Sequence, residues 1–233
     1  ISRSSRRRWP GPRLAVALDA PAGPAIDAGS NGIFTLRAKN FGTSEAYQPV
    51  FDVILSTGLR ATDPTGLPIS VSVAGGRTLT LAAGTDYTVS YTAGTGRLAI
   101  TLVSSTAYIA AGETLTAAFR ASPDNDPVNG MILLSTGAAT TYFSRDTSGG
   151  AGADTRSYNF TVASSTGGLA DGAALLTGHD HGDDALITVR APVLSLVKSV
   201  SPTTAALPAQ TTLSWSVAIT NAGPVASQAG TFT

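Results

Sequence analysis

The sequence predicts an all-β fold, an antiparallel β-sandwich, from three observations. Apolar and polar residues alternate with a period of two in several segments, as they do in strands that bury one face. Turn-forming residues separate these segments at intervals of roughly 8–12 residues, and no window shows the 3.6-residue period of a helix. Hydrophobic residues make up 42% of the chain and cysteine is absent, so apolar packing must hold the core without disulfides. Short strands at this spacing favour an Ig-like sandwich over a βαβ fold.

The predicted strands are enriched in Val, Thr and Tyr, which fit a pleated and half-buried surface. Phe34, Leu36 and Ala38, for example, are each followed by a polar residue. The same alternation marks the segments 34–39, 87–92, 98–102, 114–120 and 212–219. Turn signals with Gly or Pro lie between them, at 63–68, 82–84, 92–96 and 110–112. We therefore expect half-buried antiparallel strands joined mostly by short turns.

Residues 144–183 interrupt this pattern. The segment is rich in Gly, Ser and Asp and contains one strand-like stretch at 157–163. A segment of this length without regular structure is uncommon inside a compact domain. We expect a surface insertion that crosses the outside of the sandwich.

An internal repeat divides the chain. The stretch "LAVALDAP" (14–21) aligns with "LSLVKSVS" (194–201), and "FTLRAKNFG" (34–42) aligns with "WSVAITNAG" (215–223). The stretches 34–42 and 215–223 both end in Asn-x-Gly. Asn suits a turn because its side chain forms hydrogen bonds with its own backbone. We predict one domain over residues 12–190 and the first strands of a second, incomplete sandwich over residues 191–233.

The charge of the chain excludes some partners. Fifteen basic residues balance fifteen acidic ones, which argues against a nucleic-acid or membrane-surface partner. We interpret residues 1–11, which hold four of the arginines, as a basic disordered tail. No stretch approaches the roughly 18 apolar residues of a membrane span. The sequence also lacks an initiator Met and an apolar signal segment, so we interpret it as a fragment of a longer protein.

The stretches "LSLVKSVSP" (194–202) and "LSWSVAITNAGP" (213–224) resemble the opening of the DUF11 domain, a tandem β-sandwich repeat of bacterial surface proteins. Residues 81–122 are similar to the core of isopeptide-forming fimbrial domains. The resemblance covers most of residues 12–143 and 184–233. It implies an extracellular protein whose partners are neighbouring sandwich repeats of the same chain.

The resemblance also implies a cross-link in some family members, in which a first-strand Lys forms an amide bond with a last-strand Asn beside an acidic residue. In the first domain Leu18 stands in place of the Lys and Ser135 in place of the Asn, so we expect no bond there. In the second domain Lys198 is present, within the apolar row Leu194, Leu196 and Val200. Its bonding partner would lie outside residues 1–233. The alternative is a lysine that extends to solvent at the sandwich edge or pairs with an acid elsewhere.

Two loops concentrate the oxygen ligands that Ca²⁺ prefers. Asp124 and Asp126 lie in one loop, and the other contains Asp180, Asp183 and Asp184. Neither has the spacing of an EF-hand, and Asp is also an ordinary turn former. The histidines, His179 and His181, supply too few ligands for a transition metal, so we expect them in an exposed loop.

No catalytic arrangement is visible in the sequence, because a hydrolase needs a nucleophile with an oriented base or two placed carboxylates. We expect Glu113 to be solvated at the start of a strand. Asp52 shares a strand face with Val50 and Ile54, and we expect it to make a structural hydrogen bond to a nearby loop. We therefore do not expect an enzyme.

The sequence thus predicts a non-catalytic structural module, a stalk or adhesin segment of a large bacterial surface protein. The alternative is a calcium-dependent module that binds an extracellular glycan or protein through residues 144–183.

Overall fold

The computed structural model describes residues 11–21, 23, 25–61, 71–124, 130–136, 139–147, 157–161, 184–201, 203 and 212–227. Within these residues every regular element is a strand, which confirms the all-β prediction. Residues 1–10 of the predicted tail, most of the insertion, and the residues His179, Asp180, His181 and Asp183 lie outside the described residues. No helix in the described part of the chain is long and apolar enough to cross a membrane.

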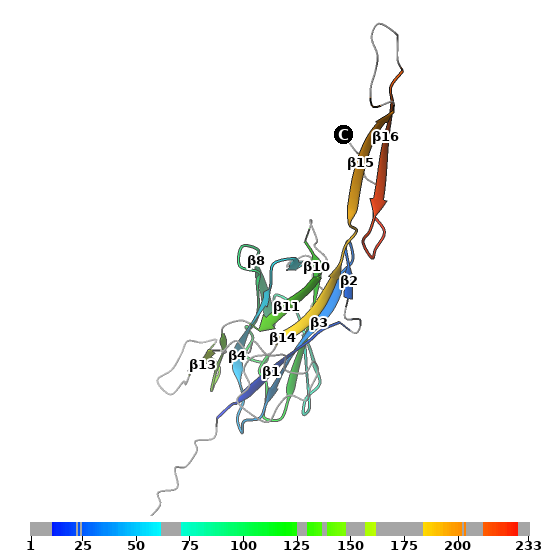
Figure 1. The fold of residues 1–233 in the computed structure, drawn as a ribbon. Coiled ribbons are helices and arrows are strands. Elements are labelled where there is room, and N and C mark those ends of the chain that lie inside the picture. Colours follow the sequence, from blue (N-terminus) through cyan, green and yellow to red (C-terminus); the bar gives the residue numbers. More distant parts are fainter. Residues whose placement is uncertain are drawn as a thin grey trace, which may run out of the picture.

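Two sheets form the body of the molecule (Figure 1). The first has the order β1-β3-β10-β6-β7, with β5 also paired to β10. Its strands are β1 (Leu14–Asp19), β3 (Gly32–Asn40), β5 (Leu59–Ala61), β6 (Val71–Ala74), β7 (Leu79–Leu81) and β10 (Thr114–Pro123).

The second sheet has the order β13-β12-β4-β11-β14-β2, with β9 paired to β4 and β8 paired to β9. It contains β2 (Ala25–Asp27), β4 (Tyr47–Leu55), β8 (Tyr87–Thr92), β9 (Arg97–Leu102), β11 (Gly130–Thr136), β12 (Ala139–Phe143), β13 (Ser157–Thr161) and β14 (Asp184–Arg190). The pairs are antiparallel except that β2 and β14 run parallel.

The core lies between the two sheets. In β3 the predicted alternation places it, because Phe34, Leu36 and Ala38 are fully buried. In β1, Leu14, Val16 and Leu18 are all less than 5% exposed. The rings of Phe34 and Phe119 stack with their centroids 5.5 Å apart. Full burial of a large apolar side chain contributes about 1.5–3 kcal/mol, so this interior supplies most of the stability of the sandwich.

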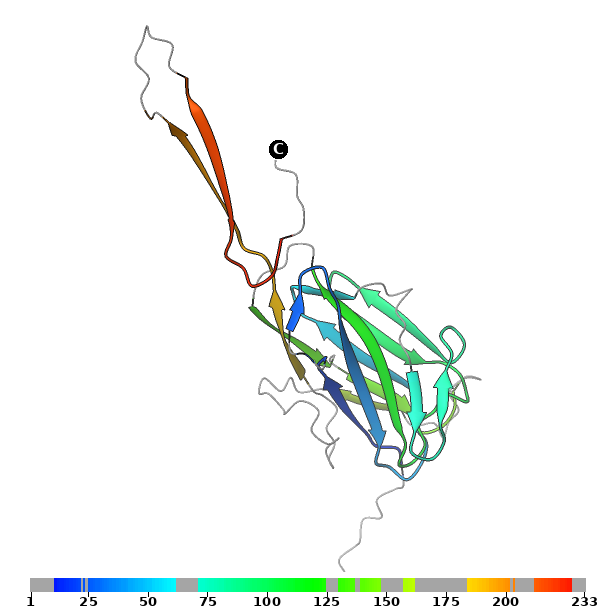
Figure 2. The ribbon, with the colours of Figure 1, turned by 90° about the vertical axis from the view of Figure 1, so that its right-hand side faces the viewer.

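A separate hairpin follows the sandwich. β15 (Leu194–Ser201) and β16 (Ser214–Asn221) pair with each other and project beyond the two sheets (Figures 1 and 2). β1 begins at the opposite end of the sandwich from this hairpin. The chain therefore enters the sandwich at one end and leaves it at the other.

Candidate functional site

The candidate functional site is the joint between β14 and β15, which the structure builds from an asparagine and a glycine. Asn221 ends β16, opposite Leu194 at the start of β15. Its Oδ1 accepts hydrogen bonds from the backbone N–H groups of Val193 (3.0 Å) and Gly223 (2.9 Å). Its Nδ2 donates to the carbonyl of Val225 (2.7 Å). One side chain therefore ties the linker, the strand end and the following turn together.

The glycine of this joint is required by close packing. A Cβ atom at Gly223 would collide with the backbone of Ala191 and Val193. The backbone N–H of Ala222 also donates to the carbonyl of Val193 (2.8 Å). The turn after β16 thus lies directly against the three-residue linker.

The same arrangement occurs where the chain enters the sandwich. Asn40 ends β3 opposite Leu14, and its Oδ1 accepts from the N–H groups of Arg13 (3.0 Å) and Gly42 (2.9 Å). Its Nδ2 donates to the carbonyls of Ser44 and Ile109, both at 2.8 Å. Both asparagines therefore bond their own downstream backbone, as the sequence predicted.

This correspondence extends to neighbouring residues. A Cβ at Gly42 would collide with the backbone of Gly11 and Arg13, in the segment 11–13 before β1. A Cβ at Gly223 would collide in the same way with the linker 191–193 before β15. Each linker has proline at its centre, Pro12 in one and Pro192 in the other. The Asn-x-Gly repeat in the sequence is therefore a repeat of atomic structure.

Lys198 lies on the apolar face of β15, as the strand alternation predicted. Its Cα pairs with that of Val217, and its Nζ lies 4.4 Å from the centroid of the Trp215 ring. Both of its strand neighbours on this face, Leu196 and Val200, are apolar. No described residue tests a bond between Lys198 and a partner outside residues 1–233, so that bond stays a prediction.

The expectation for Glu113 was wrong. Its side chain is 1% exposed and accepts four hydrogen bonds, from the backbone N–H groups of Ala110 and Arg77 and from two nitrogens of the Arg77 guanidinium. The Arg77 guanidinium also stacks on the ring of Tyr108 at 3.8 Å. Arg77 is 36 positions away from Glu113 in the sequence, so no local pattern around Glu113 predicts this ion pair. This pair fastens the turn after β6 to the loop before β10.

Asp52 lies on the outer face of β4, beside β9. Its carboxylate forms an ion pair with Arg97, at 2.8 Å between Oδ1 and Nη2. The partner is thus a side chain of the adjacent strand and not a loop, which corrects the sequence expectation. Both Asp52 and Glu113 are therefore paired with arginines.

Asp124 is the one predicted calcium ligand whose side chain the structure describes. Its Oδ2 accepts from the N–H of Gly58 (3.0 Å), while its own N–H donates to the Gly58 carbonyl (3.0 Å). Asp124 therefore closes the turn between β4 and β5. Asp126 is outside the described residues, and only the backbone of Asp184 is described, at the start of β14. In the described residues no three His, Asp or Glu side chains lie close enough to hold a metal ion.

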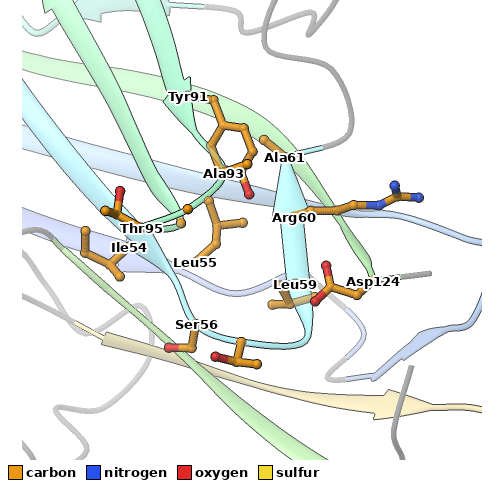
Figure 3. Close-up of a pocket in the computed structure, with 13 residues that line it drawn as sticks. Ile54, Leu55, Ser56, Leu59, Arg60, Ala61, Tyr91, Ala93, Thr95 and Asp124 are labelled. Carbon is orange, nitrogen blue, oxygen red and sulfur yellow. The ribbon is translucent and has the colours of Figure 1, made fainter. Parts of the chain in front are cut away.

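A pocket of about 920 Å³ lies beside Asp124 and was not predicted from the sequence (Figure 3). β5 forms one side, and the turn between β8 and β9 forms the other. Leu55 and Leu59 in its lining are buried, and Tyr91 is half-buried. The lining residues come from three separate parts of the chain, so only the tertiary structure brings them together.

No protein-family model matches the sequence, and no curated protein matches it. Solved structures with a similar arrangement include the full-length major pilin SpaD from Corynebacterium diphtheriae, with 10% identity and a TM-score of 0.46 over 79% of this chain and 41% of that chain. The fimbrial protein FimP from Actonomyces oris has 16% identity and a TM-score of 0.42, over 56% of this chain and 31% of that one. The major pilin subunit BcpA of Bacillus cereus has 7% identity and a TM-score of 0.43, over 79% and 42%. The chain spans less than half the length of each of these three proteins.

Proposed function

We propose that this chain is a non-catalytic structural module of an extended bacterial cell-surface protein, a stalk or adhesin segment of the DUF11 type. The observation that carries the proposal is the tied joint between the sandwich and the hairpin. A stalk must pass a pulling force from one module to the next without a loose linker. The positions at which the chain enters and leaves the sandwich, at opposite ends, suit that role (Figure 1).

The joint leaves little freedom between its two sides. On the sandwich side, Ala191 is 2% exposed, and the carbonyl of Arg190 accepts from the N–H of Ala28 (2.8 Å). On the hairpin side, Val193 is held through both its N–H and its carbonyl. Only Pro192 lies between these anchored residues, and its ring fixes φ near −65°. The linker is therefore a short braced connection, unlike a flexible Gly/Ser linker.

The joint is tested by a distance measurement between two spin labels. The chain contains no cysteine, so Ser90→Cys on β8 and Ala218→Cys on β16 provide unique labelling positions, both exposed. We expect a narrow distance distribution in the otherwise unchanged chain. Combining Pro192→Gly with Asn221→Ala should broaden it, because the φ restriction and three hydrogen bonds are lost.

Asn40→Ala is the matched control for the joint. It removes the same side chain at the far end of the sandwich, where Asn40 is fully buried and makes four hydrogen bonds. It should lower the free energy of unfolding by about 2–3 kcal/mol and leave the distance distribution narrow. A distribution in the unchanged chain as broad as in the double variant would contradict the stalk proposal.

We further propose that Lys198 forms the amide cross-link that the family resemblance implies, with an Asn side chain from outside residues 1–233. The strand of Lys198 repeats β1 in the sequence. β1 contacts β14, so the first and last strands of the described sandwich lie close together. The Lys198 Nζ would attack the Asn carbonyl carbon, the new C–N bond would form, and ammonia would leave. In a longer expression product, the intact mass should fall by one ammonia for a folded sample. An unshifted mass would rule the cross-link out.

The alternative function, calcium-dependent binding of a glycan or protein through residues 144–183, stays a prediction. Its ligands Asp180 and Asp183 lie outside the described residues, and no described contact favours it over the structural role.

A further inference from the structure

The pocket beside Asp124 has the size and the lining of a small-molecule site. Its volume of about 920 Å³ lies within the roughly 300–1,000 Å³ range of ligand pockets in proteins. Part of the lining is apolar, with Leu55 and Leu59 both at most 4% exposed. The lining side chains that carry a hydroxyl or a charge are Ser56, Thr57, Arg60, Tyr91, Thr95 and Asp124. An apolar surface combined with a few polar groups is typical of sites that bind a polar small molecule.

Two of the polar lining residues offer what a sugar ring needs. The Asp124 carboxylate accepts from the Gly58 N–H through Oδ2, and no described group bonds its Oδ1. The Tyr91 side chain points from β8 into the space beside β5 (Figure 3). A carboxylate oxygen accepts a proton from a hydroxyl, and the face of a tyrosine ring packs against C–H groups. A sugar ring has hydroxyls along its edge and C–H groups on its faces.

Arg60 adds a positive charge that the described residues do not neutralise. Its side chain is exposed and extends outward from β5 at the rim of the pocket (Figure 3). Ion pairs with an acid hold four other arginines of the sandwich, namely Arg37, Arg77, Arg97 and Arg190. Arg60 has no ion-pair partner in the described part of the chain. A guanidinium in this state is a ready partner for a carboxylate, which it binds through two parallel hydrogen bonds.

A second arginine lies next to Arg60. Ser122 of β10 pairs with Arg60, and Arg120 precedes Ser122 by two positions on β10. Arg120 is therefore a diagonal neighbour of Arg60 on the outer face of the sheet, within reach of a long side chain. No acid among the described residues pairs with Arg120 either. Two neighbouring cations repel each other, so this rim favours a ligand that brings a negative charge.

We propose that this pocket binds an acidic sugar residue of a glycan, one that carries a carboxylate. The sugar ring packs on Tyr91, and one of its hydroxyls donates to Asp124. The sugar carboxylate pairs with the Arg60 guanidinium, and the charge of Arg120 adds to the attraction. The site uses no calcium and no residue of the segment 144–183, so it differs from the calcium-dependent alternative. It does not rest on the stalk proposal, which concerns the joint between β14 and β15.

The lining disfavours other classes of ligand. A nucleic acid would bring several phosphates close to Asp124, and two arginines are too few to neutralise them. A lipid chain would leave the charged and hydroxyl groups of the lining without hydrogen bonds, which costs free energy when they are removed from water. A sugar acid satisfies both the arginine and the hydroxyl-binding groups.

Probes that differ only in charge test the proposal. Tri-galacturonic acid and sialyllactose are each compared with their methyl esters, which keep the hydroxyls and lose the negative charge. Binding is measured by NMR titration of the isotope-labelled chain in buffer that contains EDTA. We expect at least one acid to bind about tenfold more tightly than its ester, because hydrogen bonds to charged groups are the stronger ones. Added salt should reduce this preference.

Arg60→Gln should abolish the preference, so that acid and ester bind equally. The melting temperature should not change, because Arg60 is exposed and has no ion-pair partner among the described residues. Arg145→Gln is the matched control, since Arg145 is also exposed and is not part of the pocket lining. It should keep the full preference. Tyr91→Leu should weaken acid and ester alike, because it removes the ring and leaves the charge.

Four results would overturn the proposal. They are the failure of both acids to bind in EDTA, a preference for the acid that survives Arg60→Gln, unchanged binding in Tyr91→Leu, and binding of hexaglutamate as tight as that of the sugar acid. The last result would assign the pocket to an acidic peptide. The spin-label distances across the joint report separately on the stalk proposal, so either proposal can fail without the other.

Discussion

Glu113→Gln is expected to lower the free energy of unfolding by about 3 kcal/mol, because it breaks a buried ion pair from one side. Glu113 Oε2 lies 2.7 Å from Arg77 Nη2, and Oε1 lies 2.8 Å from Arg77 Nε. Glutamine keeps one acceptor but points an amide N–H₂ at groups that are themselves donors. The Arg77 side chain is 29% exposed, so water offsets part of the loss and sets the effect at the lower end of the range for buried pairs.

The same substitution changes the pH dependence of stability. The hydrogen bonds from Arg77 hold the pKa of Glu113 below its ordinary value of 4.5, and burial opposes this only in part. A carboxyl whose pKa is lower in the folded state stabilises the fold above its unfolded pKa. That contribution is lost as the pH falls through the folded pKa. Urea denaturation from neutral pH to well below 4.5 should therefore show a smaller acid loss in the Gln variant than in the parent.

Asp27→Asn is the control for Glu113→Gln. Asp27 pairs with Arg190 at 2.6 Å, but the two side chains are 40% and 45% exposed. Exposed ion pairs contribute about 0–1 kcal/mol, so the variant should unfold almost as the parent does. If Glu113→Gln costs no more than Asp27→Asn, the buried pair does not stabilise the turn after β6.

Gly96→Ala is expected to cost about 3 kcal/mol through two effects at the turn between β8 and β9. Gly96 has a φ of 65°, a left-handed conformation that costs an L-residue about 1–2 kcal/mol. A Cβ there would also collide with the carbonyl oxygen of Leu55. That backbone cannot simply move away, because the N–H of Leu55 donates to the Gly96 carbonyl (2.9 Å). Urea denaturation at neutral pH measures the combined loss.

Two other glycines separate the conformational cost from the collision. Gly84 has a φ of 78° with nothing within 4 Å of an added Cβ, so Gly84→Ala should show only the cost of about 1 kcal/mol. Gly94 also has open space around it and no left-handed φ, so Gly94→Ala should change little. If Gly96→Ala and Gly84→Ala lower the free energy of unfolding equally, the turn at Gly96 moves away from the Leu55 backbone without cost. The collision would then not contribute.

Local chemistry explains which parts of the fold the sequence predicted. Alternation of apolar and polar residues decides which face of a strand is buried, so Phe34, Leu36 and Ala38 were placed correctly. Asn40 and Asn221 were predicted as turn residues because an Asn side chain reaches its own backbone two residues on. The four-residue turn between β8 and β9 was equally visible in its glycines.

Contacts between distant segments explain what the sequence did not predict. β2 has only three residues, and it pairs in parallel with β14 more than 150 positions later. Glu113 follows a glycine turn and looks like a solvated residue until Arg77 is brought against it. The partner of Asp52 is likewise supplied by another strand, at Arg97. A side chain becomes a buried charge or an exposed one only when the elements around it are known.

The sequence by itself determined the class of fold, the faces of its strands and the presence of a repeated Asn-x-Gly turn, because each depends on neighbouring residues. Only the tertiary structure decided that this turn is a joint in which Asn221 binds the linker before β15 and Gly223 packs on it. The same structure decided that Lys198 and Trp215 lie on an open apolar face while their counterparts Leu18 and Phe34 are buried. Burial depends on what packs against a strand, and that depends on residues far away in the chain.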